Sequence, residues 1–253
     1  MLTRAILRRP GPDFAAGLTT ARLGAPDPRR MLAQHAAYAD ALLTLGLQVE
    51  VLDPLPGFPD AYFVEDVAVV VPELAVVARP GALPRRGEAE GIVPALARHR
   101  ELARLEPPGT LDGGDVLIVG HSVLIGVSAR TNEEGADQLA RLLRPHGYDS
   151  RKVPVAAGLH LKSSVSWLGG ETLLVSARFA DRPEIRSFRR LVVDAQEEAA
   201  CNTLLVNGTL LTPAGFPKAR RQLEDLDVPV IELDVSEARK MDGGLTCMSL
   251  RLD

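Results

Sequence analysis

The chain has 253 residues, of which 46% are hydrophobic and 25% charged, the balance of a globular protein that buries a core. Its net charge of −4, with acidic and basic residues interspersed, argues against nucleic acid as a main partner, because phosphate binding needs a concentrated basic surface. The longest apolar runs, such as 67–71, are strand-sized, which argues against a membrane span or a secretion signal. Two cysteines, Cys201 and Cys247, are too few for a disulfide framework, so we predict a cytoplasmic protein.

A strand–turn–strand pattern recurs along the chain. Short apolar runs joined by two-residue turns predict four hairpins, and the turn Asn207-Gly208 is the strongest of these signals. The paired runs are 67–71 with 74–77, 115–119 with 123–127, 163–167 with 172–175, and 203–206 with 209–211.

Amphipathic segments alternate with these hairpins. Residues 131–134 have the pattern of a capping box that opens a helix, which ends before Gly147. Pro217 opens another helix, whereas Gly91 and Pro94 interrupt the helical pattern around them. Apolar residues at helical spacing predict helices over 31–45, 88–99, 131–146 and 217–226.

The spacing of the units, roughly 40 to 50 residues, is typical of a radial array rather than one open sheet. The ends of the chain, 4–7 and 247–252, each offer one strand, so together they can build a fifth unit. A closed ring removes exposed sheet edges, which favours this closure physically. The alternative is an ordinary α/β sandwich with four hairpins, and the pattern alone favours neither. In both cases we expect residues 1–253 to form a single catalytic domain.

Residue types that are typical of catalytic sites stand directly before each hairpin or final strand. These are Asp60, Glu65 and Asp66 before the first, Asp112 before the second, His160 before the third, Asn202 before the fourth, and Cys247 before the last strand. If the units are pseudo-symmetric, the side chains converge on one end of the axis. Carboxylates, one imidazole and one thiol would then share a site, the chemistry of a thiol nucleophile with an acid/base partner.

Convergent carboxylates around a thiol favour a cationic substrate, and paired carboxylate oxygens can hold a planar guanidinium. A guanidinium stays protonated near neutral pH, so its carbon is a poor electrophile until it is bound and oriented. The bound cation also lowers the cost of forming the reactive thiolate. A histidine could then protonate the departing amine and activate water, and an aspartate could fix its tautomer.

Six segments, spread over nearly the whole chain, match a known family in its own order: 17–20, 63–66, 110–115, 129–132, 159–162 and 242–247. The chain resembles the dimethylarginine dimethylaminohydrolases, guanidino-modifying enzymes built on a five-bladed α/β propeller (the pentein fold). The resemblance implies a cofactor-free and metal-free hydrolase. It would convert mono- or asymmetric dimethylarginine to citrulline and methylamine or dimethylamine, through a covalent S-alkylthiouronium cysteine intermediate. Release of ammonia in an arginine deiminase-like reaction is the alternative.

The resemblance implies three catalytic residues: Cys247 as the nucleophile, His160 as the general acid and base, and Asp112 as its acidic partner. Some bacterial members carry glutamate in place of Asp112. Around Asn202 the order of residues departs from the family pattern, so we assign Cys201 a structural role.

The resemblance also implies a set of substrate-binding residues. The acids would contact the guanidinium end, the arginines would meet the α-carboxylate bidentately, and the backbone at Leu18 would meet the α-amine as a lid with hinges at Gly17 and Gly24. The implied residues are Asp66, Asp60, Glu65, Arg130, Arg85, Leu18 and Met241.

Several of these residues also have a purely structural interpretation. Asp112 and Asp242 both lie in Asp-Gly-Gly, a turn signal, and we assign catalysis to Asp112 and the turn to Asp242. Arg85 could be a solvated residue at a helix start.

The residue types are also compatible with two other classes of function. A metal hydrolase could use cysteine, histidine and aspartate ligands, but the chain has no Cys-x-x-Cys or His-x-x-x-His spacing. Zinc at Cys247 and His160 is conceivable as inhibition. A non-enzymatic arginine-binding module would keep the carboxylates without turnover, and the presence of both Cys247 and His160 argues against it. The sequence leaves a monomer or a homodimer open.

Overall fold

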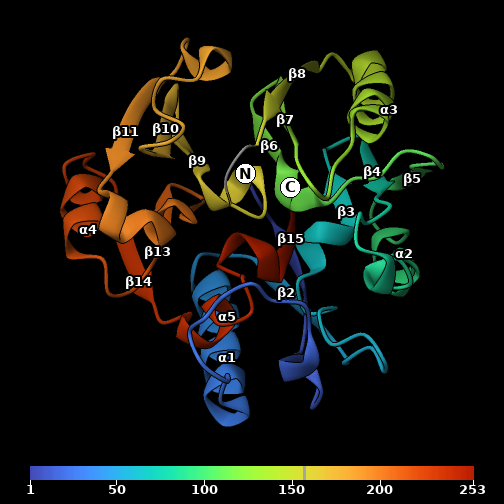
Figure 1. Ribbon diagram of the computed structural model, residues 1–253, viewed down its shortest axis with the longest axis horizontal. Helices are drawn as coiled ribbons and strands as arrows, with labels where there is room; N and C mark the ends of the chain where they lie inside the picture. Colours follow the sequence, from blue (N-terminus) through green and yellow to red (C-terminus); the bar gives the residue numbers. More distant parts are fainter. Residues whose placement is uncertain (156–157) are drawn as a thin grey trace.

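A computed structural model of the protein describes residues 1–155 and 158–253. Within these residues, the strands form five sheets of three strands each. The sheets are arranged as blades around a central axis, with the larger helices on the outside (Figure 1). The fold is therefore the five-bladed α/β propeller, and the sandwich interpretation is wrong.

All five blades have the same topology. The middle strand pairs antiparallel with the inner strand and parallel with the outer strand. The inner strands are β3 (Ala68–Val70), β6 (Val116–Val119), β9 (Val165–Gly169), β12 (Leu204–Val206) and β15 (Ser249–Leu252). The middle strands are β4 (Leu74–Val77), β7 (Ser122–Val127), β10 (Thr172–Ser176), β13 (Thr209–Pro213) and β1 (Arg4–Arg8). The outer strands are β5 (Glu101–Arg104), β8 (Asp149–Pro154), β11 (Arg189–Val193), β14 (Val230–Leu233) and β2 (Gln48–Leu52).

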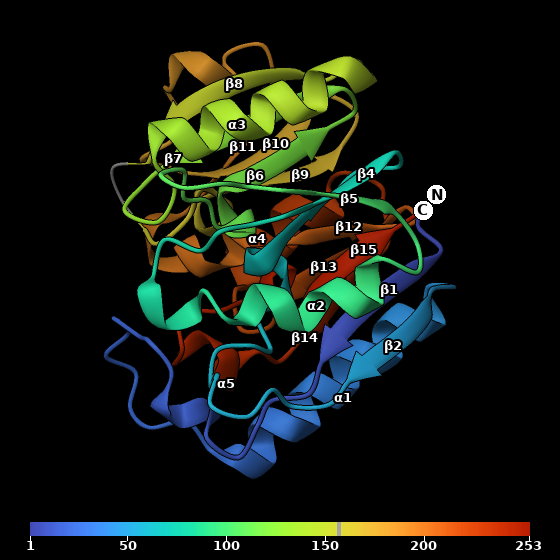
Figure 2. The same cartoon turned by 90° about the vertical axis from the view of Figure 1, so that its right-hand side faces the viewer.

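The two ends of the chain close the ring. β15 pairs antiparallel with β1, with Ile6 opposite Leu250, and β1 pairs parallel with β2. The termini lie together in both views (Figures 1 and 2). The predicted hairpins and the fifth blade built from both termini are confirmed.

In four blades an α-helix connects the middle strand to the outer strand: α1 (Pro28–Thr44), α2 (Glu88–Leu96), α3 (Glu133–Leu143) and α4 (Pro217–Glu224). In the third blade the short 3-10 helix η7 (Pro183–Ile185) stands there instead, because Arg182 is extended before the proline. The described residues also form the short helices α5 (Ser236–Arg239), η1 (Phe14–Ala16), η3 (Leu83–Arg85) and η5 (Arg144–His146), and five more that precede the inner strands.

Two helix starts differ from the prediction. α1 begins at Pro28 rather than at 31, because the Asp27 carboxylate accepts hydrogen bonds from the amides of Arg29 and Arg30, at 2.8 and 3.0 Å. α3 is capped by Asn132, whose side-chain oxygen accepts from the Gly135 amide at 2.8 Å. The capping box that begins at residue 131 is therefore wrong by one position.

The hydrophobic core is divided among the interfaces between neighbouring blades. In one cluster, for example, Leu124 of the second blade packs with Val165 and Leu173 of the third. In the described part of the chain, each of the five clusters joins two adjacent blades. No helix among these residues has both the length and the apolar character needed to cross a bilayer.

Each inner strand is preceded by a 3-10 helix: η2 (Val64–Val67), η4 (Gly113–Asp115), η6 (Leu161–Ser163), η8 (Ala195–Cys201) and η9 (Thr246–Met248). These helices contact one another in series around the axis. The predicted polar positions lie in or next to them, so the pseudo-symmetry gathers those residues at one end of the propeller.

Candidate active site

A small cavity at this end of the axis is lined by most of the predicted site residues. Its volume is about 20 Å³, close to the space that one water molecule needs. The predicted residues that line it are Cys247, His160, Asp66, Asp60, Arg130, Arg85, Leu18 and Met241. The thiol and the imidazole therefore share one cavity.

The Asp112 carboxylate is hydrogen-bonded to the imidazole of His160. Its Oδ2 lies 3.0 Å from His160 Nε2, and the Asp112 side chain is completely buried. The other carboxylate oxygen accepts a hydrogen bond from the Gly81 amide at 2.9 Å. The carboxylate is thus fixed by the backbone and can in turn fix the tautomer and orientation of His160.

Asp66 lies on the opposite side of the ring. Its Oδ1 is 3.9 Å from His160 Nδ1, and its Oδ2 is 2.6 Å from Arg85 Nη1. Burial lowers the pKa of His160, but Asp66 and the hydrogen bond to Asp112 more than offset this and raise it to about 9. Burial opposes ionisation of Asp66, yet His160 and Arg85 lower its pKa overall. The imidazole is accordingly protonated near neutral pH and faces an ionised carboxylate.

The two glycines after Asp112 are required by close packing. A Cβ at Gly114 would lie 2.7 Å from His160 Nδ1 and 2.8 Å from Asp66 Oδ1, and one at Gly113 would lie 2.0 Å from the carbonyl oxygen of Glu65. Neither glycine has a positive φ angle, so the turn interpretation of this Asp-Gly-Gly is wrong. Asp242 does adopt a positive φ of 58°, as predicted for a turn.

Cys247 lies in η9 with its thiol buried. Burial, followed by the negative charges of Glu65 and Asp66, raises its pKa to about 12, so the resting residue is a neutral thiol. Asn202 anchors the preceding residue: its side-chain oxygen accepts from the Thr246 amide at 2.9 Å, and its Nδ2 donates to Thr246 Oγ1 at 3.1 Å. Cys201, in contrast, is buried among apolar side chains of the third and fourth blades.

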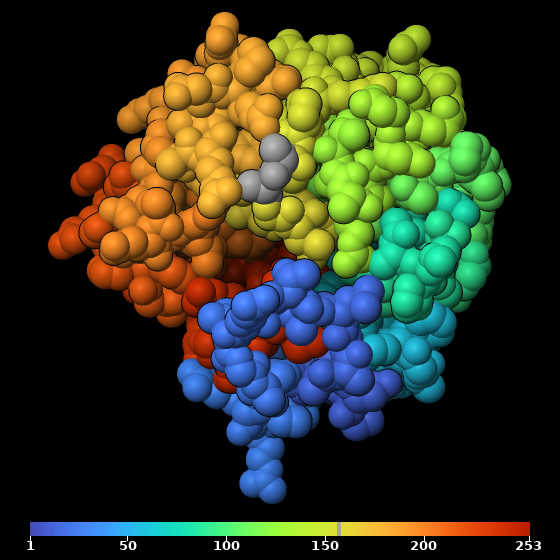
Figure 3. All heavy atoms as spheres, viewed as in Figure 1, coloured from blue at the N-terminus to red at the C-terminus, as the bar shows by residue number. Residues whose placement is uncertain are grey.

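The segment around Leu18 covers the cavity. The Leu18 amide donates to Asp60 Oδ2 at 2.9 Å, and Thr19 Oγ1 donates to the Lys240 carbonyl at 2.9 Å. The Asp242 carboxylate accepts from the Thr20 amide and hydroxyl. Figure 3 shows this N-terminal part of the chain, in blue, lying over the C-terminal part in red. These contacts hold the segment around Leu18 over the cavity.

The two predicted arginines differ in their surroundings. Arg85 is buried and its guanidinium is held by Asp66 and by Glu88, with the Nη2–Oε2 distance at 2.8 Å. It is therefore not a solvated residue at a helix start. Arg130 lines the cavity, and its Nη1 is buried without a hydrogen-bond partner among the residues described. Such a donor is suited to an incoming carboxylate.

Glu65 does not line this cavity. Its Oε1 lies 2.6 Å from Lys162 Nζ and 2.8 Å from Arg251 Nη2, beside a different cavity on the same axis. The structure therefore places it away from the predicted contact with a guanidinium, because its neighbour Asp66 occupies that direction.

The sequence alone did not predict a role for Asp115, a buried carboxylate next to the site. Asp115 accepts hydrogen bonds from Ser128 Oγ and Thr131 Oγ1, both at 2.7 Å, and from the Leu161 amide at 2.9 Å. It thus fixes the residue after His160. Asp115 stands in the same motif as Asp112, but its position at a strand start hid this role.

One set of metal-ligand atoms comes together in the described residues: Asp66, Asp112 and His160, with their ligand atoms within 4.8 Å of one another. A metal there would compete with the hydrogen bond between Asp112 and His160. Cys247 does not belong to this set, so these atoms are not the Cys247–His160 pair considered above for inhibitory zinc.

Comparisons with known proteins show the family of the chain. The chain is 40% identical to the N(G),N(G)-dimethylarginine dimethylaminohydrolase of Pseudomonas aeruginosa, over 99% of this chain and 100% of that protein. The chain belongs to the dimethylarginine dimethylaminohydrolase family. A second member, from Streptomyces coelicolor, is 38% identical over 98% of this chain and 96% of its own length. A family model described as arginine deiminase also matches residues 47–168.

A solved structure of a relative has the same fold as this member of the dimethylarginine dimethylaminohydrolase family. A Cys→Ser variant of the P. aeruginosa enzyme in complex with citrulline superposes with a TM-score of 0.97, at 40% identity and over 99% of each chain.

Proposed function

We propose that the protein hydrolyses N-omega-methylated arginine to citrulline and methylamine or dimethylamine, with Cys247 as the nucleophile, His160 as the general acid and base, and Asp112 orienting His160. The observation that carries the proposal is the shared cavity. It is lined both by the buried thiol of Cys247 and by the protonated imidazole of His160, which is flanked by two carboxylates. The citrulline complex of the P. aeruginosa relative supports this product.

The chemistry begins with binding of the guanidinium by Asp66. The bound cation offsets the negative charges around Cys247, so the thiol loses its proton to solvent. The thiolate attacks the guanidinium carbon and forms a C–S bond. His160 donates its proton to the departing nitrogen, the C–N bond breaks, and the amine leaves an S-alkylthiouronium on Cys247.

In the hydrolysis that follows, His160 acts as a general base instead of a general acid. The neutral His160 takes a proton from water, and the hydroxide adds to the thiouronium carbon. The C–S bond breaks, Cys247 leaves as a thiolate, and the remaining hydroxyl proton passes to solvent, which yields citrulline. Every step uses residues of this chain and water alone.

The other end of the substrate would meet the outer part of the cavity. Arg130 Nη1, buried without a partner in the described residues, is suited to the α-carboxylate. The Leu18 backbone would take the α-amine, with Gly17 and Gly24 as hinges of the lid and Met241 as an apolar wall, and Asp60 would join Asp66 at the guanidinium. Arg85 would contact the α-carboxylate only by exchanging one of its present ion pairs, and in the meantime it holds Asp66 in place.

The proposal is tested by comparing amine products. Purified protein should release citrulline and dimethylamine from asymmetric dimethylarginine, and Cys247→Ser should lose at least about a thousandfold in kcat while remaining folded. Cys201→Ser, the matched control, should keep most of the activity. Equal or faster ammonia release from arginine would assign the protein to the deiminases, the class suggested by the family model over 47–168.

We also propose that the protein works in the cytoplasm. Both cysteines are free thiols, as suits a reducing compartment, and a catalytic Cys247 requires a reduced thiol.

A further inference from the structure

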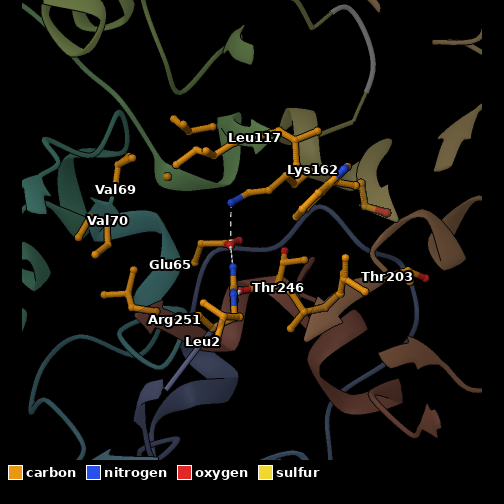
Figure 4. Close-up of a pocket in the computed structure, with 18 residues that line it drawn as sticks. Leu2, Glu65, Val69, Val70, Leu117, Lys162, Thr203, Thr246 and Arg251 are labelled. Carbon is orange, nitrogen blue, oxygen red and sulfur yellow. Dashed lines mark hydrogen bonds and ion pairs between the residues drawn. The ribbon is translucent and has the colours of Figure 1, made fainter. Parts of the chain in front are cut away.

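Three charged side chains form an ion triplet directly behind the site. Glu65 Oε1 lies 2.6 Å from Lys162 Nζ and 2.8 Å from Arg251 Nη2, so one carboxylate oxygen bridges two cations. Figure 4 shows the carboxylate between the two cationic groups. The Glu65 side chain is 3% exposed, and those of Lys162 and Arg251 are 10% and 16% exposed.

The ion triplet lines a cavity of about 250 Å³ that is separate from the active-site cavity. Its other walls are largely apolar, with Val69, Leu117 and Leu204 among them. Charges act strongly over short distances in such surroundings, because water screens them poorly. Glu65 Oε2 has no hydrogen-bond partner in the described residues, so Lys162 and Arg251 are the cations that compensate the charge of Glu65.

Each member of the ion triplet is tied to a proposed active-site residue. Glu65 precedes Asp66 in η2, and Lys162 lies in η6, two residues after His160. Arg251 Nη1 donates at 3.1 Å to the carbonyl of Thr246, the residue before Cys247. The triplet is therefore connected to the proposed catalytic groups through adjacent residues and through the Thr246 carbonyl.

Titratable and charged groups of both signs surround Cys247. η2 contributes the carboxylates of Glu65 and Asp66, and the preceding loop contributes the carboxylate of Asp60 and the phenol of Tyr62, which is neutral because burial raises its pKa. η6 contributes the protonated His160 to the shared cavity. Arg85 and Arg130, which line the same cavity, are cationic, and Arg85 is paired with Asp66. The net effect of Glu65 on the thiol thus depends on its own two cations.

We propose that Glu65, Lys162 and Arg251 are positioning residues: the two cations offset the charge of Glu65 behind Cys247 and so control how readily the thiolate forms, without touching the substrate. This inference rests on the proposed role of Cys247 as the nucleophile. It gives Glu65 a function different from the guanidinium contact expected from the sequence.

The test measures the alkylation rate of Cys247 by iodoacetamide against pH, in a Cys201→Ser background so that one thiol reacts. Lys162→Met leaves Glu65 less compensated, so at a fixed pH below the midpoint the alkylation rate should fall roughly tenfold, which corresponds to a midpoint higher by about one unit. Glu65→Gln removes the negative charge and should lower the midpoint. The double variant should have a midpoint close to that of the parent protein. Lys162→Arg keeps the positive charge and should also have the parent midpoint.

Arg251→Met repeats the test from β15 if Lys162→Met does not fold. Leu173→Ala, in the core of the third blade, is the control for lost stability and should leave the midpoint unchanged. Shifts of the same sign in Lys162→Met and Glu65→Gln, or no shift in folded variants, would overturn the inference. The alkylation assay contains no dimethylarginine and does not depend on turnover. A failure to produce citrulline would therefore refute the proposed function, whereas the alkylation midpoints would still test the role of the ion triplet.

Discussion

At the scale of single residues, the site depends on one imidazole held between two carboxylates. Asp112 is completely buried and is bound by the backbone amide of Gly81, so it cannot turn away from His160. Asp66 lies 3.9 Å from the other ring nitrogen, with its Oδ2 paired to Arg85 and its Oδ1 accepting from the Gly114 amide at 3.2 Å. The ring is therefore charged before a substrate arrives, which suits a general acid for the departing amine.

Replacing Asp112 by asparagine keeps an acceptor for His160 but removes the charge. We expect kcat to fall by about two to four orders of magnitude, and the alkaline limb of the pH profile to move to lower pH. The pKa of His160 is raised to about 9, so its proton stabilises the folded state below pH 6.5 and this stabilisation is lost as the pH rises through 9.

The measurement for Asp112→Asn is the pH dependence of both kcat and the free energy of unfolding. Asp149→Asn, at an exposed position in β8, is the control and should alter neither. An alkaline limb that stays in place would contradict the assigned role of Asp112.

At the scale of elements, short 3-10 helices carry the chemistry and longer helices carry the packing. η2, η4, η6 and η9 each present a side chain at the same end of the axis because each precedes an inner strand in the same way. α1 packs its buried face, which includes Met31, His35 and Tyr38, against the closing blade. His35 is unusual on this face because it is polar and its Nε2 has no partner in the described residues.

His35 should make stability fall in acid. Burial lowers its pKa to about 4, so the unfolded chain binds the proton more readily than the folded one between pH 6.5 and pH 4. Stability from this residue is present above pH 6.5 and is lost as the pH falls, by about 3 kcal/mol in total.

Urea unfolding at several pH values checks the role of His35. His35→Leu should show a shallower loss of stability between pH 6.5 and pH 4 than the parent protein, whatever its stability at neutral pH. His146→Gln, at an exposed position at the end of η5, should keep the parent slope. The idea fails if the parent and His35→Leu lose stability equally in acid.

At the scale of the whole molecule, stability is shared around the ring. Each hydrophobic cluster in the described residues joins two neighbouring blades, so no blade has a core of its own. The closing blade contains both termini, and its strand β15 is the one that follows Cys247. Loss of the closing blade would therefore remove two interfaces and displace the thiol.

Core substitutions in different blades should accordingly lower the midpoint temperature of one common unfolding transition. We expect Leu250→Ala in the closing blade and Leu173→Ala in the third blade each to cost about 2–5 kcal/mol, because both side chains are buried and leave cavities. Thermal unfolding followed by circular dichroism should show a single transition in both variants. Leu43→Ala, at a position that is 52% exposed, is the control, and a separate early transition in Leu250→Ala would argue against a cooperative ring.

The sequence alone predicted the hairpins, most helices and the segments that carry the site, because these depend on neighbouring residues: alternating apolar runs, two-residue turns and short motifs. It missed the capping by Asp27 and Asn132 by a few positions, since several nearby residues could have capped the same helices. Only the tertiary structure decided between a ring and a sandwich, because ring closure depends on pairing between the two ends of the chain.

The tertiary structure also decided the partners of charged residues. Glu65 and Asp66 are adjacent in sequence, yet one faces Lys162 and Arg251 and the other faces His160, because consecutive residues of η2 point to different sides. The residue types predicted the chemistry of the site. The directions of the side chains, and hence which carboxylate serves the imidazole, depend on packing among segments that lie far apart in the sequence.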